Sequence, residues 1–135
     1  MWRLLLLSAF VFCCACRPLL DGGWSGTANC TNDAFPVDAL FDETGPGDVT
    51  GTMFISGIFG GLTSKGTIEN GKRKDDGSYA GDLQTDTDPT PEFDFAVAYK
   101  GSSVDDLKGP SHVLDNNGAV SDTCDLTLAR VGIAD

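Results

Sequence analysis

Two cysteines near opposite ends of the chain, Cys30 and Cys124, constrain its fold more than any other feature of the sequence. The other three cysteines, Cys13, Cys14 and Cys16, belong to an N-terminal segment with the features of an export signal. An even pair that remains in an exported protein is best interpreted as a disulfide. Such a bridge closes a loop of most of the domain, so the first and last segments of the fold must lie side by side.

The N-terminal segment has the pattern of a secretory signal. Arg3 precedes an apolar run at positions 4–12, in which Ser8 is the one polar residue, and Ala15 supplies the small side chain that signal peptidases require. The apolar run is too short for a transmembrane helix, which needs about 20 apolar residues. We therefore expect residues 1–15 to be removed on export.

The residue after Ala15 is a cysteine, and this arrangement resembles the lipobox of bacterial lipoproteins. In that family the cysteine thiol is acylated and the cysteine becomes the new N-terminus. The resemblance implies lipidation of Cys16, with Cys14 as second choice, and Cys13 stands where the family usually has leucine. A lipid anchor would place the protein on a membrane of the bacterial cell envelope, facing the periplasm or the outside. Plain secretion after cleavage at the same bond is the alternative. The expected parts are a signal peptide at 1–15, a lipidated cysteine and tether at 16–23, and one domain at 24–135.

The composition is strongly acidic. Twenty Asp and Glu residues against nine Lys and Arg residues give a formal net charge of −11. This balance argues against a nucleic-acid partner, which requires basic stripes, and against electrostatic docking on anionic lipid. It is compatible with a cationic protein partner, but a solvated acidic surface is the simpler interpretation.

Short strand-like segments separated by turn sequences fill the rest of the chain, and no helical periodicity of useful length appears. Alternation of apolar and polar residues is clearest at 93–100. Asn117-Gly118 predicts a hairpin turn, because Asn-Gly tolerates positive φ. About eight strands at this spacing indicate an antiparallel sandwich or barrel. The other expected strands are 24–31, 35–41, 49–56, 66–69, 78–85, 107–114 and 119–131.

A bridge between Cys30 and Cys124 favours a barrel over a sandwich. If the two cysteines lie directly opposite in antiparallel strands, Trp24 lies opposite Arg130 on the same face, because side chains alternate with period two. Neighbouring first and last strands are what closes a barrel. An immunoglobulin-type sandwich fits poorly, since no Trp lies between the two cysteines. The predicted fold class is all-β, a small antiparallel up-and-down barrel of about eight strands.

The ends of the domain also carry a family resemblance. Gly22-Gly23-Trp24 near the first strand and Arg130 on the last resemble the signature of the calycin superfamily, which includes lipocalins, fatty-acid-binding proteins and avidins. In that group a Trp at the barrel base packs on an Arg from the last strand. The resemblance implies that Trp24 and Arg130 form a structural cation–π pair that plugs one end of the barrel.

The sequence offers no convincing catalytic site, and we expect a non-enzymatic protein without a metal or cofactor. His112 is the single histidine, and no Ser or Cys nucleophile pattern accompanies it. Asp86, Asp88, Glu92 and Asp94 cluster, but their spacing does not match an EF-hand calcium loop. We interpret this cluster as a solvated acidic loop.

Inward-facing apolar and aromatic side chains are the candidates for a ligand site. They are Met53, Ile55, Tyr79, Phe93, Phe95 and Tyr99. An eight-stranded barrel is either filled by such side chains or holds one small ligand. We expect a cell-envelope protein that binds a small apolar ligand, which requires a lined cavity opposite the Trp24–Arg130 base. The alternative is a protein-interaction module, or an inhibitor of a cationic hydrolase or protease, which requires a filled core and acidic loops on one rim.

Overall fold

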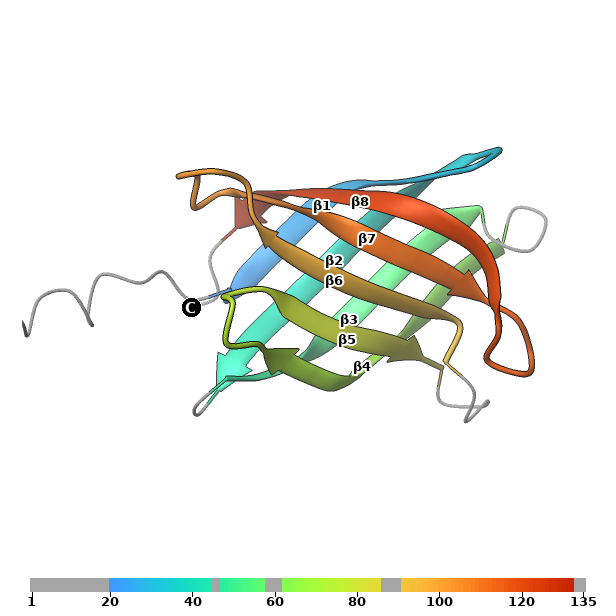
Figure 1. Cartoon of the computed structure of the whole chain (residues 1–135), viewed down its shortest axis with the longest axis horizontal. Coiled ribbons are helices and arrows are strands. Elements are labelled where there is room, and N and C mark those ends of the chain that lie inside the picture. Colours follow the sequence, from blue (N-terminus) through green and yellow to red (C-terminus); the bar gives the residue numbers. More distant parts are fainter. Residues whose placement is uncertain (1–19, 45–46, 58–61, 86–90, 133–135) are drawn as a thin grey trace, which may run out of the picture.

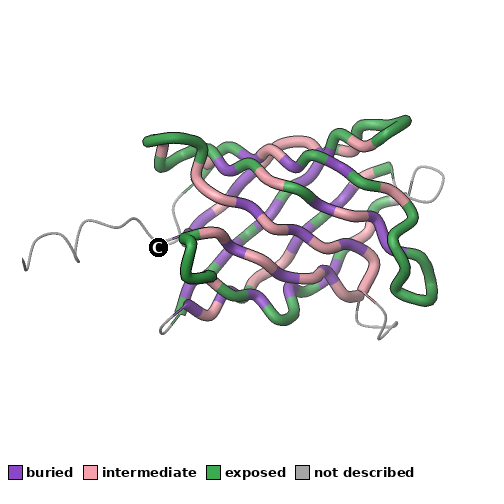
Figure 2. The backbone as a smooth tube through the Cα atoms, in the orientation of Figure 1, coloured by how far each residue is buried: buried purple, intermediate pink, exposed green. Residues whose placement is uncertain are grey.

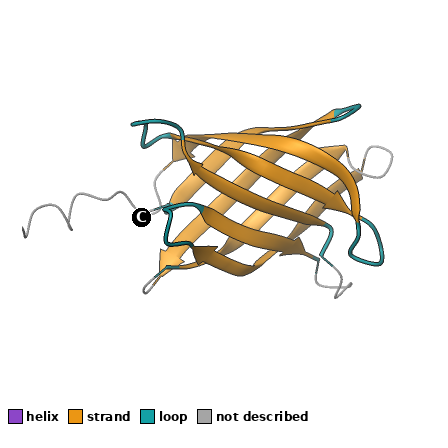
Figure 3. Ribbon diagram, viewed as in Figure 1, coloured by secondary structure: helices purple, strands orange, loops and turns teal. Residues whose placement is uncertain are grey.

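Eight antiparallel strands close into a barrel in the computed structural model of the chain (Figure 1). The structure describes residues 20–44, 47–57, 62–85 and 91–132. Neighbouring strands follow the order of the chain, and the last strand pairs with the first. The predicted all-β up-and-down barrel is confirmed, and the described residues contain strands and loops but no helix (Figure 3). The strands are β1 (Gly22–Cys30), β2 (Ala34–Thr44), β3 (Asp48–Gly57), β4 (Leu62–Arg73), β5 (Tyr79–Gln84), β6 (Phe93–Tyr99), β7 (Asp106–Leu114) and β8 (Val120–Gly132).

Strands β1 and β8 form the seam that closes the barrel, in the register predicted from the two cysteines. Cys30 lies opposite Cys124, and Trp24 lies opposite Arg130. The disulfide between Cys30 and Cys124 is present and joins residues 94 positions apart. Both the pairing of the terminal strands and the bridge are therefore confirmed.

Alternation along the strands separates a core face from a solvent face. In β2, for example, Val37, Ala39 and Phe41 are buried while their immediate neighbours are exposed. Figure 2 shows the same alternation of buried and more exposed positions around the barrel. Successive side chains point to opposite faces of a strand, so a closed sheet gathers every second residue into one core.

The two ends of the barrel differ. At one end, which we call the base, β1 begins, β8 ends and the connections 74–78 and 100–105 join neighbouring strands (left in Figure 1). At the opposite end, the turns 31–33 and 115–119 connect β1 to β2 and β7 to β8. We call this second end the distal rim.

Four strand boundaries differ from the sequence prediction by two residues or more. Strand β1 begins at Gly22, β2 continues to Thr44, and β4 runs from Leu62 to Arg73 instead of over 66–69. The extension of β4 has a local cause. Asn70 adopts a left-handed conformation with φ 56°, and the pairing of β4 with β5 shifts register beside it. A β-bulge of this kind bends a strand without ending it.

Candidate functional site

The base is sealed by Trp24 and Arg130. The guanidinium carbon of Arg130 lies 4.3 Å from the centre of the Trp24 ring, within cation–π range. Arg130 also donates to the backbone oxygen of Asp21 at 2.6 Å and forms an ion pair with Asp105 at 3.3 Å. Trp24 is almost completely buried, and Arg130 is half-buried. The pair stands where the calycin resemblance placed it, and Asp21 and Asp105 hold the guanidinium of Arg130 there.

A buried carboxylate next to this pair was not anticipated from the sequence. Glu43 is only 7 % exposed. It accepts hydrogen bonds from the Tyr79 hydroxyl and the Leu20 backbone N–H, both at 3.1 Å, and pairs with Arg73 at 3.4 Å. A buried charge is tolerated only when it is paired and hydrogen-bonded, and Glu43 is both. Period-two alternation from Phe41 could have revealed it, since Glu43 continues the inward face of β2.

The residues before β1 complete the base. Leu20 is fully buried, and its backbone oxygen accepts a hydrogen bond from the Trp24 indole N–H at 2.9 Å. The Asp21 side chain accepts from the Glu43 backbone N–H at 2.5 Å. Leu20 and Asp21 therefore belong to the packed domain, although the sequence suggested a tether up to residue 23.

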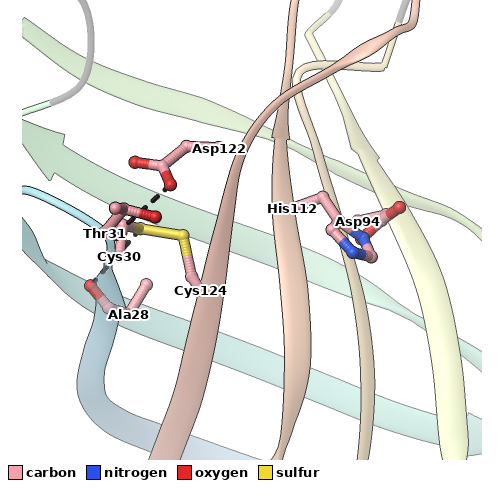
Figure 4. Close-up of a disulfide and its surroundings, with 7 residues drawn as sticks. All are labelled: Ala28, Cys30, Thr31, Asp94, His112, Asp122 and Cys124. Atoms are coloured by element: carbon pink, nitrogen blue, oxygen red, sulfur yellow. Dashed lines mark hydrogen bonds and ion pairs between the residues drawn. A yellow bond between two sulfur atoms is a disulfide. The ribbon is translucent and has the colours of Figure 1, made fainter.

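The disulfide fastens the seam close to the distal rim (Figure 4). Cys124 is buried and Cys30 is half-buried. Next to the bridge, the backbone N–H of Thr31 donates to the Asp122 carboxylate at 3.2 Å. The turn 31–33 is thereby tied to β8 by a covalent and a polar link.

The six proposed ligand-lining residues all point into the barrel but fall into two groups. Met53, Ile55, Phe93 and Phe95 are each at most 3 % exposed and pack in the common core; Phe95 also lies 5.9 Å, centre to centre, from the Phe41 ring. Tyr79 and Tyr99 lie near the base, where their rings meet edge to face at 6.2 Å. The two tyrosines pack with the residues that seal the base. Only the first group therefore remains available to line the upper interior, by which we mean the part of the interior between the base and the distal rim.

One polar group stands among these apolar side chains. Ser111, on β7, is fully buried and lies opposite Phe95 and Cys124 on the neighbouring strands. Its hydroxyl has no hydrogen-bond partner among the described residues. A buried hydroxyl without a partner costs about 1–3 kcal/mol, so this atom is a place where an additional polar group would be favourable.

The single histidine lies on the outer wall. The His112 ring nitrogen Nδ1 is 2.7 Å from the Asp94 carboxylate, and both side chains are about one-third exposed (Figure 4). They border a shallow hollow of about 300 Å³ on the outer wall, together with Asp82 and Pro110. Glu92 immediately precedes β6, and its carboxylate accepts a hydrogen bond from the Ser64 hydroxyl, while Asp86 and Asp88 lie outside the described residues.

Charge is distributed unevenly along the barrel axis. Four acidic residues lie at the distal rim without a cationic partner among the described residues. Lys65 is the only described lysine or arginine in the distal half. The base also exposes acids, but cations lie among them and some pair with them, as Lys72 does with Asp48 and Arg73 with Glu43. The four rim residues are Asp33, Glu92, Asp115 and Asp122.

No family model, no curated protein and no solved structure matches the chain. Within the described ranges, no three His, Cys, Asp or Glu side chains are grouped so that they could hold a metal ion. Nor does the described part of the chain include a helix long and apolar enough to cross a membrane.

Proposed function

We propose that this protein is an exported, non-enzymatic binding module of calycin-like type. Its signal peptide is removed, Cys16 carries a lipid that anchors it in the bacterial cell envelope, and its distal rim binds a basic surface of another protein. An inhibitor of a cationic hydrolase or protease is the partner relationship that fits this chemistry. The observation that carries the proposal is the lack of cations beside the acidic residues of the distal rim, since all described lysines and arginines except Lys65 lie in the half of the barrel toward the base.

The rim acids are continuous with one another. Asp122 is linked to the turn 31–33, which carries Asp33, through the Thr31 hydrogen bond. Glu92 accepts a hydrogen bond through its backbone oxygen from Leu114, the residue before Asp115. Hydrogen bonds from the Thr31 side chain and backbone lower the pKa of Asp122, so this carboxylate stays charged at any pH near neutrality. A concentrated negative end steers a basic partner and accelerates its association.

Neutralising the rim should weaken binding of a basic protein. Lysozyme serves as the basic probe protein. We expect it to bind roughly tenfold more weakly to the triple variant Asp33→Asn, Asp115→Asn, Asp122→Asn, because each exposed charge pair contributes about 0.2–1 kcal/mol. The effect should shrink as salt is raised. Asparagine retains the side-chain oxygen that accepts the backbone N–H groups of Asn117 and Ala119 at Asp115. Titration calorimetry at two salt concentrations measures both changes.

A variant with the same change of net charge elsewhere provides the control. Asp42→Asn, Asp75→Asn, Asp76→Asn removes three exposed acids at or near the base. If this variant loses as much affinity as the rim variant, net charge alone is responsible and the rim is not a binding surface.

A second candidate function is favoured by Ser111. We propose that an apolar molecule with one hydrogen-bonding group could occupy the upper interior, beside Met53, Ile55, Phe93 and Phe95, and satisfy the Ser111 hydroxyl. This is the ligand class expected from the sequence. Its polar group would remove the cost of the unpaired hydroxyl, while its apolar part would replace contacts within the core.

Native mass spectrometry of the protein purified from its host tests this second candidate. A ligand held by Ser111 should co-purify with the wild type and be lost or reduced several-fold in Ser111→Ala. Ser121→Ala, on an exposed site of β8, should retain it. Two results together would rule out the interior ligand. The wild type would show the mass of the protein alone, and the free energy of unfolding of Ser111→Ala would equal that of the wild type or exceed it by up to about 1 kcal/mol.

A further inference from the structure

We infer that the base of the barrel docks on the same lipid bilayer that holds the anchor at Cys16, and presents the distal rim away from the membrane. This inference rests on the proposed lipidation. It is carried by the fixed position of Leu20, by the few residues between Cys16 and Leu20, and by the exposed apolar side chains that surround this point.

The chain is held rigidly where it enters the base. The Leu20 side chain is fully buried, its N–H donates to Glu43 at 3.1 Å and its backbone oxygen accepts from Trp24 at 2.9 Å. Arg130 holds the backbone oxygen of Asp21. These contacts link the chain to β1, β2 and β8 together. Any tether to a lipid anchor must therefore end before Leu20.

The tether that remains is short. Cys16 and Leu20 are separated by four residue steps, which span at most about 14 Å when fully extended. Strand β2 has 11 residues, and at a tilt of about 40° it covers about 28 Å along the barrel axis. The lipid attachment point can therefore reach the surface around the base but not the distal rim.

Exposed apolar side chains surround the same point. Of the five exposed large apolar residues in the described chain, three lie around the base: Val131 is 69 % exposed, Leu40 54 % and Val104 47 %. Leu40 is paired with Gly23, and a Cβ added at Gly23 would lie 3.4 Å from Cγ2 of Val131. Leu40 and Val131 therefore flank Gly23, which has no side chain to separate them. Val104 lies in the connection 100–105 at the same end, where its backbone oxygen accepts from Arg130. We call Leu40, Val104 and Val131 the base apolar patch.

A bilayer is the partner that suits this patch. The side chains of the base apolar patch are aliphatic, and the short tether keeps this end of the barrel close to the lipid on Cys16. Weak insertion of apolar side chains adds to the membrane affinity that an acyl chain supplies. The distal rim is less suited to a membrane, because its carboxylates lack neighbouring cations and would be repelled by anionic lipid. Docking through the base leaves those carboxylates accessible to a soluble basic protein.

Tryptophan quenching in vesicles tests the orientation. The expected mature chain has one native tryptophan, Trp24, which is 1 % exposed and gives a constant background. The lipidated full-length product carrying Val131→Trp, at the base, is compared with Asn117→Trp, at the distal rim, in phosphatidylcholine vesicles with brominated acyl chains. Relative to vesicles without bromine, we expect the fluorescence of the added tryptophan to fall at least twofold for Val131→Trp and to be unchanged for Asn117→Trp.

The outcomes separate docking from anchoring. If mass analysis shows lipid on Cys16 but Val131→Trp is not quenched, or Asn117→Trp is quenched as strongly, docking through the base is wrong while the anchor stands. If the mature chain carries no lipid and sediments no better with vesicles than Cys16→Ala, the anchor itself is wrong and the docking falls with it.

Discussion

Gly51→Ala is expected to prevent the barrel from closing, or to lower its free energy of unfolding by more than about 3 kcal/mol. Gly51 lies on β3 with φ +144°, a conformation that residues with a side chain rarely adopt. An added Cβ would lie 2.9 Å from the carbonyl carbon of Leu40 and 3.2 Å from Cα of Phe41. Backbone strain and overpacking each cost about 1–3 kcal/mol, a large share of the 5–15 kcal/mol that stabilises a typical domain. Urea denaturation followed by far-UV circular dichroism measures the loss.

Gly118→Ala separates the two causes. Gly118 also has a positive φ, +78°, but it lies in the turn 115–119 and an added Cβ would meet no atom within 4 Å. Only the backbone strain applies there, so we expect a cost of about 1 kcal/mol. If Gly51→Ala is no more destabilising than Gly118→Ala, the close approach of β2 and β3 is not what requires glycine.

The same close approach recurs around the barrel. An added Cβ would run into the backbone carbonyl of a neighbouring strand at four further positions, none of which lies in a turn. A small barrel must bend its strands sharply, and glycines within strands permit this coiling. Composition alone shows that glycine is abundant, but it does not separate these strand positions from glycines in turns. The four positions are Gly26, Gly66, Gly71 and Gly109.

Much of the topology was predictable because two constraints fix it. Period-two alternation decides which residues face inward, and the Cys30–Cys124 bridge decides which strands meet at the seam. Together they predicted that Trp24 lies opposite Arg130, which the structure confirms. The extent of β4 was not predictable, because Asn and Gly are typical turn residues, and Asn70 and Gly71 form a bulge only when β3 and β5 pair on both sides.

The base was predictable only in part. The calycin resemblance placed Trp24 beside Arg130, but nothing in the sequence pointed to the burial of Leu20, and only the alternation along β2 pointed to that of Glu43. Glu43 is stabilised inside by Tyr79 and Arg73, which come from strands far along the chain. Such a network becomes apparent only once the strands are assembled, since a glutamate or an arginine alone would be expected at the surface.

Replacing both cysteines, Cys30→Ser with Cys124→Ser, is expected to lower the free energy of unfolding by about 4 kcal/mol. The bridge closes a loop of 94 residues, and cross-links across long loops restrict the unfolded chain most. Urea denaturation of the double variant and of the wild type, oxidised and reduced, measures the effect. The reduced wild type should match the double variant. A difference below about 1 kcal/mol between oxidised wild type and double variant would show that β1 and β8 hold together without the bridge.

The kinetics should show when the seam forms. Hairpins between sequential strands are local, whereas β1 and β8 pair residues about a hundred positions apart, so the seam should close last. If the seam is still open in the transition state, the bridge restricts the unfolded chain and the transition state alike, and its loss leaves the folding rate nearly unchanged. Unfolding should then become faster by roughly a thousandfold, the whole of about 4 kcal/mol. A slower folding rate with unchanged unfolding would instead place the pairing of β1 with β8 before the transition state, and make the disulfide a guide for barrel assembly as well as a lock.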